Sequence, residues 1–381
     1  MKRKAVVLGC GLVGATMARD LAADPTFEVT AVDVSEKNLR RLAGVPNVGT
    51  LAVDLGTPER VKAAVAGFDL VIGAMPSTLG YATLQAVIES GKPYVDISFM
   101  VEDATQLDAL AKKRGVTAVV DCGVAPGLAN FVIGHCVAQL DAVDDVVFYV
   151  GGLPKERHWP YEYKACFAPF DVLEEYTRPA RMIENGRVVV KPALSEPELI
   201  DFPHVGTLEA FNTDGLRSLL TTIQSPNMRE KTLRFPGHID LMRVLRETGF
   251  FGKEEIEVRG VKIRPLDVTS KLLFPMWELE PGKEEFTVLR VIVEGRKDGK
   301  ALRHVHDLYD ETDRATGDTS MARTTGFPCV IVGRMILEGR FSKPGVFPPE
   351  TLGREPGLME HVTKELAARG VALTGRVEAV D

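Results

Sequence analysis

The hydrophobic and polar positions in the first third of the chain follow two alternating patterns. Short apolar runs rich in valine, isoleucine and leucine are each followed by a stretch with the apolar spacing of an amphipathic helix. The runs predict strands at residues 4–8, 27–32, 51–53, 69–74, 93–97 and 116–120. The stretches between them predict helices at residues 12–23, 35–42, 57–66, 81–90 and 102–114. This alternation indicates an α/β domain with a doubly wound parallel sheet over residues 1–122.

The pattern changes after residue 122. Residues 286–296 and 301–309 read as two strands, and the Asp298-Gly299 pair between them is a strong hairpin signal. Residues 123–320 are therefore predicted to form a second, α+β domain with an open mixed sheet, a common place for subunits to pair as a homodimer. Helical patterns return at 327–336 and 356–369, and we expect residues 321–381 to pack back on the first domain.

Composition narrows the class of protein. A chain of 381 residues predicts two domains, and 45% hydrophobic with 26% charged residues is typical of a soluble globular protein. The net charge of -7 disfavours nucleic-acid binding, and no apolar run approaches the roughly 18 residues of a membrane span. The basic residues at 1–4 are interpreted as the start of the first strand rather than as a signal segment. Five scattered cysteines without a C-x-x-C pair indicate a reducing compartment and predict a cytoplasmic location.

A glycine motif joins the first predicted strand to the first predicted helix. Gly9 would allow a tight turn, Gly11 would let the backbone approach a pyrophosphate, and Gly14 would let the helix pack closely on the strand. The helix N-terminus would present free N–H groups to the phosphates. The position of the motif predicts a Rossmann dinucleotide site, with all six motif residues at the cofactor. The motif reads Gly9-Cys10-Gly11-Leu12-Val13-Gly14.

The residue that follows the second predicted strand selects the cofactor. Asp33 would accept hydrogen bonds from the ribose hydroxyls of an adenosine. A carboxylate there would repel a 2′-phosphate, and Val34 and Ser35 offer no arginine to receive one. The sequence therefore predicts NAD rather than NADP.

Other cofactor neighbours are expected where further strands end, because ligands bind doubly wound sheets at the carboxyl ends of the strands. Asp54 is either an adenine neighbour or a helix-capping acid. Met75, Pro76 and Ser77 follow the fourth strand, where the backbone should contact the cofactor, and Val124 is a further expected neighbour.

Several motifs, in the same order along nearly the whole chain, resemble the saccharopine dehydrogenase-like family. The resemblance implies a Rossmann domain with the C-terminal segment returning to it, and an inserted substrate domain that forms a dimer. It also implies hydride transfer at a carbon–nitrogen bond of a lysine- or polyamine-derived substrate. Besides the glycine motif, the matching segments are Tyr94-Val95-Asp96-Ile97-Ser98, Gly123-Val124-Ala125-Pro126-Gly127, Gly151-Gly152-Leu153-Pro154, Thr213-Asp214-Gly215-Leu216-Arg217 and Thr232-Leu233-Arg234-Phe235-Pro236-Gly237-His238.

One position differs from part of this family and favours one of its branches. Ala125 stands where saccharopine reductases and carboxynorspermidine dehydrogenases carry an aspartate, and Val-Ala-Pro-Gly resembles the lysine 6-dehydrogenase branch. That branch oxidises the ε-amine of L-lysine with NAD and releases ammonia. Its product, 2-aminoadipate 6-semialdehyde, cyclises to piperideine-6-carboxylate. The alternatives are a reductase that joins an amine to a semialdehyde and a non-enzymatic NAD-binding redox sensor or scaffold.

Oxidation of an amine requires proton transfer. The ammonium of free lysine, with a pKa of about 10.4, must lose a proton before its carbon can release a hydride. Asp96, after the fifth strand, is one candidate base, unless it only forms a turn. His238 is the other, unless it is a structural histidine.

Recognition of an amino acid requires groups that bind its carboxylate and its amine. Arg217 and Arg234 are candidates for the carboxylate, with surface ion pairs as the alternative role. Thr213 and Asp214 are candidates for the α-amine.

One histidine pair is a candidate metal site. His304 and His306 share a strand face near Asp307 and Asp310, but no third ligand at typical spacing is evident, so no metal is predicted.

Overall fold

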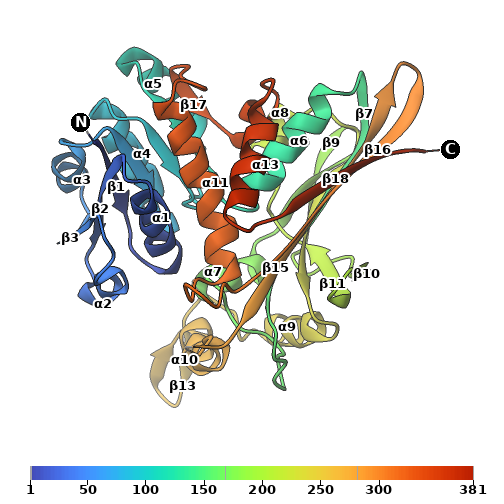
Figure 1. Ribbon diagram of the computed structural model, residues 1–381. Coiled ribbons are helices and arrows are strands. Elements are labelled where there is room, and N and C mark those ends of the chain that lie inside the picture. Colours follow the sequence, from blue (N-terminus) through green and yellow to red (C-terminus); the bar gives the residue numbers. More distant parts are fainter. Residues whose placement is uncertain (1, 168, 281, 381) are drawn as a thin grey trace. The chain divides into compact units, whose positions relative to one another are not determined.

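The computed structural model describes residues 2–167, 169–280 and 282–380 and contains two compact units (Figure 1). The first unit combines residues 1–138 with residues 322–373, and the second combines residues 139–321 with residues 374–381. In this division the chain passes from the first unit to the second after Ala138.

The first unit is built on a seven-stranded sheet in which every strand pair described is parallel. The strand order is β17-β6-β5-β4-β1-β2-β3, so the order reverses beside β1. This confirms the predicted doubly wound fold, in which ligands bind at the carboxyl ends of the strands beside the reversal of strand order. The strands are β1 Arg3–Leu8, β2 Phe27–Asp33, β3 Val48–Ala52, β4 Leu70–Gly73, β5 Tyr94–Asp96, β6 Thr117–Val119 and β17 Gly345–Phe347.

Helices connect these strands, and local sequence explains where they begin. Thr57 caps one helix by accepting a hydrogen bond from the Arg60 N–H, and Ser35 caps another through the Asn38 N–H. The helices of this unit are α1 Leu12–Ala23, α2 Glu36–Leu39, α3 Pro58–Val65, α4 Ser77–Glu89, α5 Asp108–Arg114, α6 Leu128–Ala138, α12 Pro349–Gly353 and α13 Leu358–Ala368, together with α11 Ser320–Leu337 from Ala322 onward.

Several elements differ from the prediction. Helix α4 begins at Ser77, so Ser77 lies in its first turn rather than in the preceding loop. Helix α11 begins at Ser320 and contains Pro328, which was expected near its start. Strand β17 was missed because three residues are too short to show a pattern, and its pairing with β6 comes from a distant part of the chain.

The second unit contains a mixed sheet with the strand order β10-β11-β12-β7-β15-β16-β18, beside which β8 pairs with β12 and β9. β12 and β7 run parallel, whereas β15 pairs antiparallel with both β7 and β16. The mixed sheet confirms the predicted fold class. Its strands are β7 Ala142–Pro154, β8 Ala180–Glu184, β9 Arg187–Lys191, β10 Glu198–Phe202, β11 Gly206–Asn212, β12 Met228–Arg234, β15 Glu285–Lys297, β16 Lys300–Glu311 and β18 Leu373–Ala379.

The expected hairpin is present between β15 and β16. Lys297 pairs with Lys300 across a two-residue loop, in which Asp298 and Gly299 have φ values of 50° and 76°. Positive φ at both central residues favours Asp-Gly, and the turn matches the twist of the flanking strands. The C-terminal strand β18 extends the sheet beside β16, where only helices had been expected.

An aromatic core packs against the second sheet. It includes Tyr163, Tyr176, Trp277 and Phe286, all of which are buried. Arg234 and His238 therefore lie among aromatic rings rather than at the surface. The helices of this unit are α7 Pro169–Thr177, α8 Leu219–Thr222, α9 His238–Glu247 and α10 Pro265–Trp277, and a small hairpin joins β13 Ile256–Val258 to β14 Val261–Ile263.

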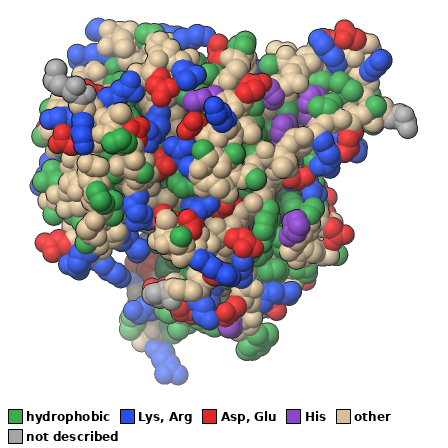
Figure 2. Space-filling view, viewed as in Figure 1, with side chains coloured by type: hydrophobic (Ala, Val, Ile, Leu, Met, Phe, Trp, Pro, Cys, Tyr) green, Lys and Arg blue, Asp and Glu red, His purple; other side chains and the backbone are tan. Residues whose placement is uncertain are grey.

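The surface carries charges of both signs. Basic and acidic side chains are interspersed over the face that Figure 2 shows. Many exposed charges form ion pairs, as in the contacts of Arg157 with Glu162 and of Arg314 with Glu284. Among the described helices, none is long and apolar enough to cross a membrane.

Candidate functional site

The glycine loop between β1 and α1 cannot accept side chains at two of its three glycines. Gly9 has a φ of 89°, and a Cβ there would lie 2.3 Å from the carbonyl oxygen of Ala74. A Cβ on Gly14 would lie 2.0 Å from the carbonyl oxygen of Gly9. The loop is therefore folded tightly onto both β4 and the first turn of α1.

Gly11 differs because a Cβ there would have no atom within 4 Å. It is the N-cap of α1, it has no side-chain cap, and the first turn of the helix contains no acidic residue. The first N–H groups of a helix have no intrahelical partners and favour anions. The open space at Gly11 and the uncapped helix end therefore fit the pyrophosphate of a dinucleotide.

The other residues of the motif have different environments. Leu12 is 39% exposed and Val13 is half-buried, whereas Cys10 is buried. Burial and the neighbouring Asp33 raise the pKa of the Cys10 thiol to about 11. Cys10 therefore contributes to the loop through its backbone, and its thiol is not a reactive thiolate.

Asp33 holds the glycine loop against the end of β2. Its Oδ2 accepts hydrogen bonds from the Cys10 N–H at 2.7 Å and from Asn38 Nδ2 at 3.2 Å, and its Oδ1 accepts from the Ser35 N–H at 2.7 Å. A carboxylate has about four lone-pair positions, so acceptor capacity remains for a ribose hydroxyl. Sequence reasoning missed Asn38, because an asparagine in a short helix carries no motif.

Asp54 lies in a different environment from Asp33. It is exposed, accepts a hydrogen bond from the Gly56 N–H at 2.9 Å, and contacts Arg60. These contacts are typical of an acidic residue in a turn. They explain the position of the Asp54 carboxylate without a bound ligand. Its role beside an adenine stays a prediction.

The segment after β4 runs beside the glycine loop. The Ala74 N–H donates to the carbonyl oxygen of Leu8 at 2.8 Å, and Ala74 is the residue that Gly9 approaches. Met75 and Ser77 are half-buried, Pro76 is exposed, and Pro76 precedes α4 without a side-chain cap. The structure thus places the predicted Met75-Pro76-Ser77 segment at the same edge of the sheet as the N-terminus of α1.

Asp96 ends β5 at this same edge and is fully buried. Its Oδ1 accepts a hydrogen bond from the Ser98 N–H at 2.5 Å. Across the described chain, its Oδ2 and the hydroxyl groups of Tyr94 and Ser98 have no hydrogen-bond partner. A Cβ on Gly73, the last residue of β4, would lie 3.0 Å from Asp96 Oδ1 and 2.0 Å from the Tyr94 hydroxyl, so only glycine leaves room for this cluster.

The environment of Asp96 tunes its acidity. Burial raises its pKa to about 7, while the neighbouring Ser98 and Tyr94 lower this pKa and the charge of Asp121 raises it. A buried carboxyl group with a pKa near neutrality and one oxygen without a partner has the properties of a general base.

Val124 lies in the loop that precedes α6. Its side chain is buried, and its carbonyl oxygen accepts a hydrogen bond from the Ala129 N–H at 3.0 Å. Gly127, with a φ of 139°, packs against Gly123 so closely that a Cβ would lie 1.9 Å from the Gly123 carbonyl oxygen. The loop is compact, and a cofactor contact of Val124 stays a prediction.

Arg234, at the end of β12, is buried in the second unit. It donates hydrogen bonds to the Tyr176 hydroxyl at 3.0 Å, the Leu233 carbonyl oxygen at 2.9 Å and Glu175 at 2.7 Å. Its guanidinium also stacks 4.3 Å from the centre of the Tyr163 ring. Arg234 is therefore too deeply buried to form a surface ion pair, the alternative role for this arginine.

His238 belongs to the same network. Its Nδ1 lies 2.8 Å from the Tyr161 carbonyl oxygen and its Nε2 lies 2.9 Å from the Tyr176 hydroxyl. A carbonyl oxygen only accepts, so Nδ1 donates and Nε2 accepts from Tyr176. Burial and Arg234 lower the His238 pKa to about 3. Both ring nitrogens are engaged, and these contacts favour a structural histidine over the predicted base.

The predicted α-amine ligands are also engaged within the protein. Asp214 accepts two hydrogen bonds of 2.9 Å from the guanidinium of Arg181. The Thr213 hydroxyl contacts Glu230 and lies 2.8 Å from the Thr232 hydroxyl. The structure therefore supplies both Thr213 and Asp214 with protein partners.

Arg217 is half-buried and has a left-handed φ of 53°. It lies in the loop that Glu230 anchors, because a Cβ on Gly215 of that loop would lie 2.6 Å from Glu230 Oε2. Burial raises the pKa of Glu230 to about 8. Sequence reasoning missed Glu230 because a charged residue inside a strand pattern is usually interpreted as solvent-facing.

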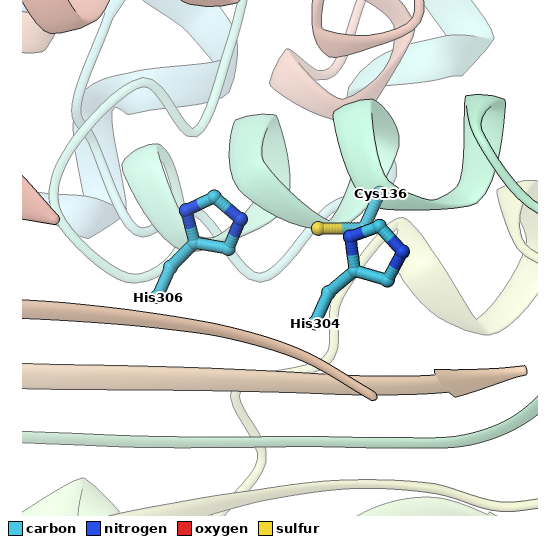
Figure 3. A group of neighbouring side chains, drawn as sticks. All are labelled: Cys136, His304 and His306. Carbon is cyan, nitrogen blue, oxygen red and sulfur yellow. The ribbon is translucent and has the colours of Figure 1, made fainter. Parts of the chain in front are cut away.

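His304 and His306 project from the same face of β16 (Figure 3). His304 is buried and His306 is half-buried, whereas Asp307 points to the other face and binds Arg290 and Arg376. Cys136, also labelled in Figure 3, comes from α6 of the first unit. The absence of a metal stays a prediction.

The doubly wound sheet, the tight glycine loop and the acid after β2 define a dinucleotide-binding protein of the Rossmann class. Two family models match the chain: the saccharopine dehydrogenase NADP binding domain over residues 5–119 and the saccharopine dehydrogenase C-terminal domain over residues 123–371. The chain belongs to the saccharopine dehydrogenase family. It is an oxidoreductase of that family, and its N-terminal domain indicates a nicotinamide cofactor.

Relatives share most of the chain at low identity. Carboxyaminopropylagmatine dehydrogenase of Synechocystis sp. is 25% identical, over 93% of this chain and 94% of the relative. Carboxynorspermidine synthase of Vibrio cholerae is 24% identical, over 76% of this chain and 74% of the relative. The solved structure of apo saccharopine dehydrogenase (L-Glu forming) from Saccharomyces cerevisiae has a TM-score of 0.81 at 18% identity, over 99% of this chain and all of that chain, and shows the shared fold.

Proposed function

We propose that this protein catalyses the NAD-dependent oxidative deamination of the ε-amine of L-lysine to 2-aminoadipate 6-semialdehyde, with release of ammonia. The observation that supports it most is Asp96, a buried carboxyl group with a pKa of about 7 whose Oδ2 has no hydrogen-bond partner among the described residues. It lies at the edge of the sheet that carries the glycine loop, one strand beyond the β4 segment that Gly9 contacts.

The proposed chemistry assigns the proton transfers to this chain. Asp96 takes a proton from the ε-ammonium, so that the nitrogen lone pair can assist loss of hydride from the ε-carbon. A bound nicotinamide supplies the hydride acceptor. Water then adds to the resulting imine, and ammonia leaves to give the semialdehyde.

NAD is proposed over NADP because of Asp33. Its carboxylate is held by hydrogen bonds from Cys10, Ser35 and Asn38, so it cannot turn away from the ribose without breaking them. A fixed negative charge would repel a 2′-phosphate.

A substrate panel tests the proposal. L-lysine with NAD+ is expected to give NADH absorbance and stoichiometric ammonia, with a much lower rate with NADP+. Absence of both products at saturating L-lysine would refute the proposed reaction, and a preference for NADP+ would refute the cofactor assignment.

A second candidate is a reductase that joins an amine to a semialdehyde. The names of the Synechocystis and Vibrio cholerae relatives favour it. This candidate predicts consumption of NADH or NADPH when a semialdehyde is supplied with an amine such as glutamate, without ammonia release. Cofactor binding without turnover across both assays would instead indicate a redox sensor or scaffold.

We also propose a cytoplasmic homodimer that pairs through the second unit. All five cysteines are free and buried, as expected in a reducing compartment. Exposed apolar side chains concentrate on α9, α10 and the β13–β14 hairpin, where a subunit interface would cover them. They are Leu241, Val244, Ile256, Val258, Val261, Val268, Leu272 and Met276. Light scattering should give twice the chain mass, and Leu272→Asp should reduce it.

A further inference from the structure

A closed circuit of hydrogen bonds joins the acid at the end of β2 to helix α2. Asp33 Oδ1 accepts from the Ser35 N–H at 2.7 Å, and Ser35 Oγ accepts from the Asn38 N–H at 3.4 Å. The Asn38 side chain returns to the acid, because its Nδ2 donates to Asp33 Oδ2 at 3.2 Å. Asp33 and Asn38 therefore hold each other in place through both backbone and side-chain bonds.

The same two residues hold the glycine loop. The Cys10 N–H donates to Asp33 Oδ2 at 2.7 Å, and the Cys10 thiol donates to the Asn38 carbonyl oxygen with 3.9 Å between sulfur and oxygen. A thiol is a weak donor, so the backbone bond to Asp33 is the stronger of the two. The loop, the acid and α2 all belong to the first unit, so this arrangement does not depend on the second.

Asn38 makes a contact with Asp33 that a substitution can remove. In the described part of the chain, Cys10 and Ser35 also donate to this carboxylate, but through their backbone N–H groups. Every residue except proline supplies a backbone N–H, so side-chain changes at these two positions leave their donors in place. The residue at position 38 thus decides whether Asp33 Oδ2 receives a side-chain donor.

Positive charges act on the same region. Burial and Asp33 raise the pKa of the Cys10 thiol, whereas the charges of Arg19 and Arg41 lower it. The charges of both arginines therefore reach the glycine loop, where they would favour an additional phosphate on the cofactor. The Asp33 carboxylate opposes them only while it faces the ribose.

We propose that Asn38 is a positioning residue that sets the cofactor preference by holding the Asp33 carboxylate toward the ribose 2′ position. This inference rests on the NAD preference in the proposed function. With Asp33 held, a 2′-phosphate meets a negative charge that cannot turn away without breaking the bond from Asn38. Without that bond, the carboxylate can turn aside, and the arginine charges are no longer opposed at the ribose.

Asn38→Leu tests the inference, because leucine has nearly the same size as asparagine but donates no hydrogen bond. Gln85→Leu is the matched control, since the Gln85 amide donates to the Glu89 carboxylate at 3.0 Å on the exposed surface of α4. Asp33→Asn and the double variant with Asn38→Leu complete a double-mutant cycle. Asn38→Ala replaces Asn38→Leu if leucine prevents folding.

The measured quantity is the Kd for NADP+ divided by the Kd for NAD+, obtained by calorimetry on the full chain. Asn38→Leu should lower this ratio about 3- to 10-fold, because one of the hydrogen bonds to a charged group is lost while the backbone donors remain. Gln85→Leu should leave the ratio within about twofold. In the Asp33→Asn background, Asn38→Leu should change the ratio by less than about twofold, because the charge that Asn38 positions is already absent.

A purely structural role of Asn38 gives a different result. Loss of α2 packing alone would lower the unfolding temperature and weaken both cofactors equally, so the ratio would not move. An unchanged ratio in Asn38→Leu would therefore overturn the inference, whatever the stability of the variant. A change of the same size in the Asp33→Asn background would also overturn it, because Asn38 would then act without Asp33.

These binding measurements need no amine substrate, so they test the inference even if L-lysine is not oxidised. A wild type that prefers NADP+ would refute the NAD assignment and the inference together. A wild type that prefers NAD+, with the same ratio in Asn38→Leu, would refute the inference alone.

Discussion

Replacement of Asp96 by asparagine should make the protein more stable and nearly inactive. Asp96 is fully buried, and its pKa is raised from 3.8 to about 7 by burial. That difference corresponds to about 4 kcal/mol by which ionised Asp96 disfavours the folded state. Asparagine is neutral at all pH values, and its side-chain oxygen can still accept the Ser98 N–H.

The sign of the pH dependence follows from the raised pKa. Below about pH 4, Asp96 is protonated in both the folded and the unfolded chain, so it favours neither. Between about pH 4 and 7 the unfolded chain loses this proton while the folded chain keeps it, so the contribution of Asp96 to stability falls as pH rises. Asp96→Asn should therefore match the wild type near pH 4 and exceed it by up to about 4 kcal/mol at pH 8.

Activity should change in the opposite direction. If Asp96 accepts the substrate proton, kcat/KM of the wild type should fall tenfold per pH unit below about pH 7. Asp96→Asn should lose about 100- to 10,000-fold in kcat without loss of cofactor binding.

Denaturant unfolding at pH 5 and pH 8 and NADH formation with L-lysine together test this prediction. Asp103→Asn is the control, because Asp103 is exposed and only caps a short helix, a role that asparagine also fills. Retained activity in Asp96→Asn would remove Asp96 as the base. Equal stability of the variant and the wild type at pH 8 would refute the predicted free-energy cost of burying the ionised Asp96 carboxylate.

Three further predictions concern the two units separately. Gly14→Ala should abolish dinucleotide binding measured by NADH fluorescence, because its Cβ would lie 2.0 Å from the Gly9 carbonyl oxygen, whereas Gly67→Ala, with no atom within 4 Å, should bind normally. Asp33→Asn should raise the kcat/KM ratio of NADP+ to NAD+ by about 10-fold or more, and an unchanged ratio would contradict the charge argument. His238→Gln should destabilise the protein by about 2–4 kcal/mol in urea through its two buried hydrogen bonds, while kcat stays within about threefold; loss of kcat without loss of stability would restore His238 as a base.

The sequence predicted the first sheet well because its signals are local. Most strands are short apolar runs, and some helices begin at a local side-chain cap, as at Ser35 and Thr57. Strand β17 and the C-terminal strand β18 were missed because their pairing partners lie far away in the chain.

The candidate site was only partly predictable for the same reason. Gly9, Gly14 and Asp33 can be identified from their spacing along the chain, and the structure places them together. Hydrogen-bond partners are not visible in a sequence, so His238 could not be distinguished from a base until Tyr176 was seen to occupy its second nitrogen.

The sequence by itself determined the doubly wound sheet, the glycine loop, the acid at the end of β2 and the Asp-Gly hairpin, since turn chemistry and periodicity act over a few residues. Only the tertiary structure decided which polar side chains are left without partners. It supplied Arg181 to Asp214 and Glu230 to Thr213, and it buried Asp96 with one oxygen that has no hydrogen-bond partner among the described residues. Acidity and recognition depend on burial and neighbours, and residues distant in sequence provide both.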